Sequence, residues 1–140
     1  MKKLLFSNPT HSTPASISLL IQRLIFGFFM LFGHGWGKLV SFGDRMDSFP
    51  DPLGVGSAVS LALAVFAEVL CAFLVGIGFL TRAALIPLII TMLVAAFMVH
   101  GADPLFGRAP SKEMALLFLA AYVSIFVAGP GKFSIDRLLK

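Results

Sequence analysis

The segment Leu53–Thr81, LGVGSAVSLALAVFAEVLCAFLVGIGFLT, decides the fold class, because Glu68 is its only charged residue. A helix needs about 20 apolar residues to cross the hydrocarbon core of a bilayer, at a rise of about 1.5 Å per residue. The strands of a membrane barrel are about ten residues of strict alternation, a pattern that this segment does not have. The segment therefore predicts a membrane-spanning helix.

Three further segments have the same apolar character, so we expect the chain to cross the membrane four times. They are Ile17–Phe32, which contains Arg23 and continues towards Lys38, and then Ala83–Ala102 and Met114–Gly131. The predicted helices cover about residues 16–40, 53–80, 82–100 and 112–129. Because the connections between them are short, they favour an up-down-up-down bundle. We predict an all-α polytopic membrane protein that forms one domain over residues 1–140.

The composition supports a membrane location. Of the 140 residues, 58% are hydrophobic and only 13% are charged, whereas soluble domains carry about 25% charged residues. Such a small set of polar side chains does not cover the surface of a soluble domain of this size. Intrinsic disorder requires the opposite balance of charge and hydrophobicity. Neither a soluble single domain nor a disordered chain is expected.

The net charge of +4 is interpreted as membrane topology and not as nucleic-acid binding, because the cations form no block of five or six. One predicted face of the membrane carries a surplus of cations, namely Lys2, Lys3, Arg82, Lys132, Arg137 and Lys140. On the opposite face, acidic residues balance Lys38, Arg45, Arg108 and Lys112. The positive-inside rule then predicts that both termini are cytoplasmic, in a bacterial inner membrane.

Two charged residues fall well inside the predicted spans, and an ionisable group in lipid is by default a candidate for function. Glu68 lies near the middle of the second span, and Arg23 lies about a third of the way along the first. The long arginine side chain makes an Arg23–Glu68 pair geometrically possible. Such a pair could be part of a site or could only set the register of the helices.

A second polar group is predicted at the outer end of the bundle. His34 and Lys38 close the first span, His100 closes the third, and Glu113 opens the fourth after a candidate N-cap, Ser111. Histidine beside a carboxylate suits a quinone carbonyl or a proton relay. The alternative is that these side chains anchor the helix ends at the headgroups or complement a helix dipole. Two isolated histidines indicate metal or haem only weakly, and no metal site is predicted.

Three stretches taken together resemble the DoxX family. They are LLIQRLIFGFFMLFGHGWGKLVSF, AEVLCAFLVGIGFLTRAALIPLIITMLVAAFMVH and KEMALLFLAAYVSIFVAGPGKFSID, and the resemblance extends over Ile17–Asp136. It includes a G-x-G-x-x-T-R turn and a Gly-Pro-Gly-x-x-Ser-x-Asp close. The resemblance implies a four-helix membrane protein linked to redox chemistry, as in the membrane subunit of a thiosulfate:quinone oxidoreductase. It places the polar positions of the family on Arg23, His34, Lys38, Glu68, Arg82, His100 and Glu113.

From the residues and the resemblance together we expect a membrane subunit of a redox complex that binds a quinone or another small redox substrate. The predicted binding residues are Arg23, His34, Lys38, Glu68, His100 and Glu113. The expected partners are the lipid bilayer and a soluble or membrane oxidoreductase, and a homo-oligomer is an open alternative. Apart from the quinone, no cofactor is indicated. Two other functions stay open: a non-catalytic scaffold for a soluble oxidoreductase, and a carrier for a small molecule or protons.

Overall fold

The structure is a computed structural model, and it describes residues 12–107 and 110–139. Four cations that contributed to the predicted topology lie outside these described residues, namely Lys2, Lys3, Arg108 and Lys140. The described residues form helices and contain no strand, which confirms the predicted all-α class.

Four apolar helices make up the bundle, and three of them contain a π-helical segment. The first helix consists of α2 (Thr13–Met30), η1 (Leu31–Gly35) and α3 (Trp36–Val40). The second consists of α5 (Ser57–Val65), η2 (Phe66–Cys71) and α6 (Ala72–Ile77). The third consists of α7 (Thr81–Val94) and η3 (Ala95–Val99), and the fourth is α8 (Glu113–Ala128). Two short helices, α4 (Phe42–Arg45) and α9 (Ile135–Leu138), follow the first and fourth helices.

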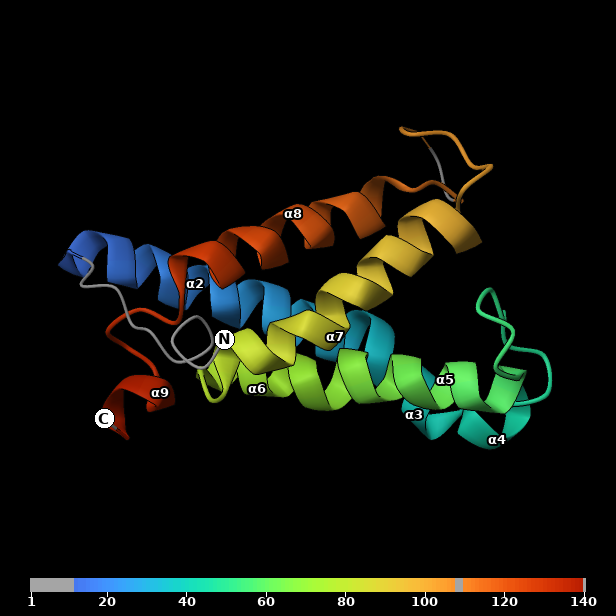
Figure 1. Cartoon of the computed structure of the whole chain (residues 1–140), viewed down its shortest axis with the longest axis horizontal. Coiled ribbons are helices and arrows are strands. Elements are labelled where there is room, and N and C mark those ends of the chain that lie inside the picture. Colours follow the sequence, from blue (N-terminus) through green and yellow to red (C-terminus); the bar gives the residue numbers. More distant parts are fainter. Residues whose placement is uncertain (1–11, 108–109, 140) are drawn as a thin grey trace.

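The first three helices are long and apolar enough to cross a membrane, whereas α8 is a shorter apolar helix of 16 residues. Consecutive helices run in opposite directions (Figure 1). Helix α2 packs on α6 and α8, and α7 packs on α6 and α8, so the four helices close into a ring. This is the predicted four-helix membrane bundle.

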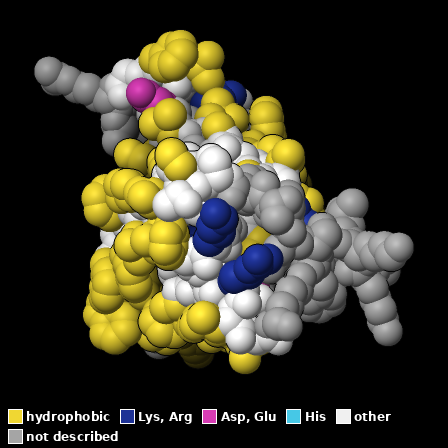
Figure 2. All heavy atoms as spheres, turned by 90° about the vertical axis from the view of Figure 1, so that its left-hand side faces the viewer, with side chains coloured by type: hydrophobic (Ala, Val, Ile, Leu, Met, Phe, Trp, Pro, Cys, Tyr) yellow, Lys and Arg dark blue, Asp and Glu magenta, His cyan; other side chains and the backbone are white. Residues whose placement is uncertain are grey.

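The bundle has two distinct ends. At the terminal end, on the left of Figure 1, α2 begins, α6 turns into α7, and α8 ends. At the loop end, on the right, lie the connections over residues 41–56 and 100–112. Figure 2 faces the terminal end, where lysine and arginine side chains stand near the middle, flanked by hydrophobic side chains. The exposed cations described at this end include Lys132 and Arg137.

The helix boundaries follow from local signals and lie within four residues of the predicted ones. The hydroxyl of Ser12 accepts a hydrogen bond from the Ala15 amide at 3.4 Å and caps α2, with Pro14 in the first turn. Helix α8 ends at Ala128, with Gly129 as its C-cap, one residue before the predicted end. The predicted N-cap Ser111 is wrong, because α8 begins one residue later than such a cap requires and Lys112 precedes it without a side-chain cap.

Hydrophobic side chains lie both inside and outside the bundle. The core residues Val75, Leu85, Leu88, Tyr122 and Ile125 are fully buried. Large apolar residues on every long helix are exposed, as a lipid-facing surface requires, and Phe29, Phe97 and Val127 are examples. A surface of this kind faces hydrocarbon and not water. The protein is therefore a membrane protein with several membrane-spanning helices.

The three π-helical segments carry or adjoin the polar residues of the inner bundle. Segment η1 contains His34, η2 contains Glu68, and η3 ends immediately before His100. A π-helical turn inserts an extra residue into a helix and occurs frequently at functional sites. These segments therefore direct attention to the region between the middle of the bundle and its loop end.

Candidate ligand-binding site

Segments η1 and η2 touch each other at a glycine. A Cβ atom on Gly35 would lie 2.6 Å from the backbone oxygen of Glu68, a distance that real Cβ atoms essentially never show. Only glycine permits this approach of the two backbones. The contact places the start of α3 directly beside Glu68.

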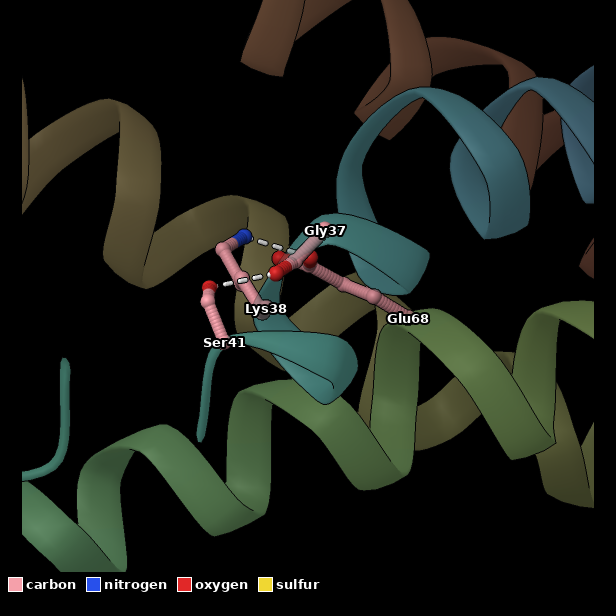
Figure 3. A network of polar contacts seen from close by, with 4 residues as sticks. All are labelled: Gly37, Lys38, Ser41 and Glu68. Carbon is pink, nitrogen blue, oxygen red and sulfur yellow. Dashed lines mark hydrogen bonds and ion pairs between the residues drawn. The ribbon is translucent and has the colours of Figure 1, made fainter. Parts of the chain in front are cut away.

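One turn after Gly35, Lys38 reaches Glu68 and forms an ion pair with it (Figure 3). The Lys38 Nζ donates to Oε2 of Glu68 at 2.5 Å, and the two side chains are 21% and 5% exposed. At the end of α3, the Ser41 hydroxyl donates to the Gly37 carbonyl at 2.6 Å. The close contact at Gly35 and the ion pair of Lys38 together join α3 to η2.

The Arg23–Glu68 pair that the sequence allowed is not formed. Arg23 is fully buried at the terminal end, where its guanidinium packs against Gly78 and donates to the Phe133 carbonyl. Gly78 lies ten residues along the chain from Glu68, which corresponds to about 15 Å of helix. This distance is beyond the reach of an arginine side chain, so Arg23 does not belong to the same polar group as Glu68.

His100 forms a second polar pair at the loop end. Its Nδ1 atom lies 2.7 Å from Oδ2 of Asp103, and the side chains are 36% and 26% exposed. A carboxylate on Nδ1 orients the ring and leaves Nε2 as the nitrogen that a ligand can meet. The sequence analysis missed Asp103, although its position three residues after a helix-terminal histidine could have indicated the pair.

A cavity of about 460 Å³ lies between these two pairs. Its polar lining comes from Lys38, Ser60, Glu68, Thr91 and His100. Its walls are apolar and come from two helices, with Leu63, Ala64 and Phe66 on one side and Pro87, Ile90, Val94, Ala95 and Val99 on the other. A volume of about 300–1,000 Å³ with apolar walls and a few convergent polar groups is typical of a small-molecule site.

The loop before α5 lines the cavity at the loop end. Four of its residues complete the lining, namely Phe49, Pro50, Pro52 and Leu53. Between them, the carboxylate of Asp51 accepts hydrogen bonds from the Ser60 hydroxyl at 2.7 Å and from the amides of Gly56 and Val55 at 2.7 and 3.0 Å. These bonds, above all the one from Ser60, lower the pKa of Asp51 below its ordinary value. They fasten the loop to α5.

The remaining predicted site residues lie beside the cavity or away from it. The His34 ring packs edge-on against Phe118 of α8, with centroids 5.5 Å apart, and lies close enough to Glu68 and Lys38 to interact with both charges. Glu113 lies at the start of α8 and is not among the described residues that line the cavity. The structure therefore brings together Lys38, Glu68 and His100, with His34 behind them.

A separate polar cluster ties the terminal end together. The carboxylate of Asp136 accepts hydrogen bonds from the Leu80 and Thr81 amides at 2.7 and 2.9 Å and from the Thr81 hydroxyl at 2.7 Å. It thereby caps α7, whose preceding residue Leu80 has a φ of 48°. Arg82 donates to the carbonyls of Phe126 and Val127 at 3.0 and 3.2 Å and so closes the end of α8.

These contacts explain two of the motifs in the sequence. The G-x-G-x-x-T-R turn and the Gly-Pro-Gly-x-x-Ser-x-Asp close bind one another, with Arg23 packed between them against Gly78 and Phe133. Gly78 has a φ of 74°, and a Cβ there would collide with Arg23, so the turn needs glycine. Arg23 and Arg82 are thus positioned as structural residues of the terminal end.

Among residues 12–107 and 110–139, no group of three His, Cys, Asp or Glu side chains is arranged to hold a metal ion. Fold and site together define a four-helix membrane protein with a largely apolar cavity that a few polar side chains line. The family model DoxX matches residues 18–101, and the chain belongs to the DoxX family. The identification made from the sequence is confirmed.

Two curated relatives are similar over most of their length. An uncharacterized membrane protein of Mycobacterium tuberculosis is 28% identical over 141 aligned positions, which cover 87% of this chain and 81% of the relative. An uncharacterized protein of Haemophilus influenzae is 28% identical over 129 positions, covering 90% of this chain and 85% of the relative. No solved structure matches the chain.

Proposed function

We propose that the protein is the membrane subunit of a redox complex and that the cavity between α5 and α7 binds a quinone. The observation that carries this proposal is the meeting of a buried Lys38–Glu68 pair and the His100–Asp103 pair in one apolar cavity. A quinone is a flat apolar ring with two carbonyl oxygens that accept hydrogen bonds. The redox chemistry implied by the resemblance to DoxX supports the same choice.

The polar residues have distinct roles in this proposal. The Lys38 ammonium has three donors, of which one serves Glu68, so it can also donate to a carbonyl oxygen of the ring. Glu68 fixes the lysine and can exchange a proton with it. His100 lines the cavity, and because Asp103, which is 26% exposed, holds its Nδ1, the Nε2 atom is the nitrogen left for a ligand.

The reduction of a quinone to a quinol adds two electrons and two protons. Electrons come from the partner oxidoreductase, and the protons are exchanged through His100 with water at the loop end. The exposed Lys132 and Arg137 at the terminal end support a cytoplasmic location of that end by the positive-inside rule. The chain then resides in a bacterial inner membrane with both termini cytoplasmic.

The test is quinone binding to the full chain in lipid nanodiscs, measured by calorimetry with a decyl-tailed dimethoxy-methyl-benzoquinone. Glu68→Gln removes the partner of Lys38 and is expected to weaken binding at least tenfold, or about 1.4 kcal/mol. Glu113→Gln makes the same chemical change outside the cavity and is expected to leave the affinity unchanged. Equal affinities of the two variants, or no binding to the unaltered protein, would contradict the proposal.

The two alternative functions predict different results with the same variants. A scaffold for a soluble oxidoreductase requires that Glu68→Gln leaves the turnover of the assembled complex intact and disturbs only assembly or stability. A carrier requires flux into liposomes in the absence of both a partner and a redox couple. Quinone co-extracted with the purified protein would favour the proposed function over both.

A further inference from the structure

We infer that the end of the chain, residues 129–139, binds anionic phospholipid at the surface of the bilayer. Leu138 and Leu139 enter the boundary of the acyl chains, and Lys132 and Arg137 contact the phosphate groups of the lipid. These four side chains are called the C-terminal surface. None of them lines the cavity, so the lipid site is independent of the proposed quinone.

The C-terminal surface lies at the level where two membrane spans end. The second and third spans are joined by a turn over residues 78–80. The Gly78 carbonyl in this turn accepts a hydrogen bond from the Asp136 amide at 2.9 Å, and the Asp136 carboxylate caps α7. Leu138 and Leu139 follow Asp136 by two and three residues, at most about 4.5 Å of helical rise. Both leucines therefore lie where hydrocarbon gives way to headgroups.

The apolar side chains at this level stand out from the protein. Leu138 is 83% exposed and Leu139 is 69% exposed, and Leu138 is the most exposed large apolar side chain in the described part of the chain. Phe133, in the same segment, is 46% exposed. Side chains of this kind at headgroup depth are stabilised when they enter the acyl-chain boundary, as the apolar faces of amphipathic helices do.

The charges beside the leucines favour anionic lipid over zwitterionic lipid. Lys132 and Arg137 are exposed, and the only acidic residue in the segment, Asp136, already accepts hydrogen bonds at the start of α7. Lys132 donates to the Thr13 hydroxyl at 3.3 Å, which uses one of its three donors. Figure 2 shows this end of the bundle, with hydrophobic side chains around lysine and arginine. Cations at the membrane surface attract anionic headgroups, and the fork of arginine matches a phosphate.

The C-terminal surface is also fixed to the bundle. Arg23 of α2 donates to the Phe133 carbonyl, and Asp136 binds the turn between α6 and α7. The segment thus connects the first span to the second and third. Because a ligand of the folded state stabilises that state, anionic lipid bound here should raise the unfolding temperature of the protein.

The experiment measures contact with lipid by tryptophan fluorescence in nanodiscs. Trp36 is the only tryptophan of the chain, so Leu138→Trp in a Trp36→Phe background carries a single reporter. The nanodiscs contain equal amounts of phosphatidylglycerol and phosphatidylcholine, with bromine on the acyl chains of one lipid or the other. Brominated phosphatidylglycerol is expected to quench the reporter at least twice as strongly as brominated phosphatidylcholine. Adding Lys132→Gln and Arg137→Gln should remove this preference, as should about 1 M salt, where the Debye length is about 3 Å.

The matched control is Met46→Trp in the same background. Met46 lies at the loop end and is 38% exposed, and its exposed neighbours Asp44, Arg45 and Asp47 include two carboxylates and one cation. A nanodisc presents the same lipids to both ends of the bundle. The control is therefore expected to show no preference for phosphatidylglycerol.

Three outcomes would overturn the inference, and none of them bears on quinone binding. Equal quenching of the Leu138→Trp reporter by both lipids, or the same preference in Met46→Trp, would show that the C-terminal surface does not select anionic lipid. No quenching by either lipid would show that the surface faces water, as a docking site for a soluble protein requires. A preference that persists in about 1 M salt would exclude Lys132 and Arg137 as its cause. The salt measurement needs no further substitution, so it decides the question even if the glutamine variant does not fold.

Discussion

Two clusters of charged residues lie in this small bundle, and they differ in what their charges contact. In the terminal cluster, Asp136 binds amides at the start of α7, Arg82 binds carbonyls at the end of α8, and Arg23 binds the Phe133 carbonyl between α8 and α9. In the cavity cluster, Lys38 pairs with Glu68 and His100 pairs with Asp103, side chain to side chain. The terminal cluster supplies hydrogen-bond partners to backbone groups, although Nε and Nη1 of the buried Arg23 have none in the structure, whereas Lys38, Glu68 and His100 of the cavity cluster line a cavity.

This difference shows that a charge inside a membrane protein is not by itself a sign of function. Backbone groups at helix ends have no water to bind when they lie at membrane depth, so a charged side chain there supplies a missing partner. The charges at the cavity instead adjoin π-helical segments, where the backbone has been rearranged. The kind of partner separates the structural residues from the candidate site.

The largest expected effect is on the terminal cluster. Asp136→Ala leaves the Leu80 and Thr81 amides without the carboxylate that caps α7. We expect a loss of about 3 kcal/mol in the free energy of unfolding, since hydrogen bonds to a charged group contribute about 1.5–3 kcal/mol each. Quinone affinity per folded molecule should stay the same. Reversible unfolding in detergent and calorimetry in nanodiscs measure the two quantities.

A second variant tests whether the cap acts through the backbone. Leu80 has a φ of 48°, a conformation that glycine adopts without strain. Leu80→Gly should therefore restore part of the stability that Asp136→Ala removes. The proposed division between the clusters breaks down if Asp136→Ala weakens quinone binding as strongly as Glu68→Gln does.

An intermediate effect is expected where η1 meets η2. Gly35→Ala forces a Cβ against the Glu68 backbone and should reduce stability by about 2 kcal/mol, as overpacking typically does. It should also displace Lys38 from Glu68 and weaken quinone binding. Gly33→Ala, in the same π-helical segment, has nothing within 4 Å of the added atom. This control should be neutral or slightly stabilising, and equal effects of the two alanines would refute the role of the close contact.

The fold was predictable because a helix needs about 20 apolar residues to cross a bilayer, and hydrophobic segments such as Leu53–Thr81 have that length. Four spans, their order and their approximate ends follow from that requirement and from Pro and Gly in the connections. The site was only partly predictable. The sequence analysis identified Glu68 as an ionisable residue inside an apolar span, and Lys38 and His100 as polar residues at the ends of two spans. The structure brings these three to one cavity.

The pairing within the site could not be derived from the sequence. Counting residues along the first span placed Arg23 near enough to the middle of the bundle to reach Glu68. In the structure Arg23 lies beside Gly78 at the α6–α7 turn, because the beginning of α2 extends past this turn. The π-helical segments are also not evident from the residue pattern, and four residues that line the cavity lie in them, namely Phe66, Glu68, Ala95 and Val99. Asp103 and Asp51 were treated as ordinary loop residues, although Asp103 lies three residues after His100 and Asp51 bonds within its own loop and to Ser60.

The smallest expected effect concerns the loop that covers the cavity cluster. Because hydrogen bonds lower the pKa of Asp51 in the folded protein, their contribution is complete above the unfolded pKa of about 3.9 and is lost as the pH falls through the folded value. The amide resonances of Val55 and Gly56 should therefore titrate with a midpoint below about 3.9. Asp51→Asn should abolish that titration and lower the unfolding temperature slightly, because the hydrogen bonds to the carboxylate are weakened. Faster binding of an untailed quinone to this variant would report easier access from water. A titration midpoint at or above the ordinary pKa of aspartate would contradict the hydrogen bonding of Asp51. Slower binding of the untailed quinone to Asp51→Asn would show that the loop does not limit access to the cavity from water.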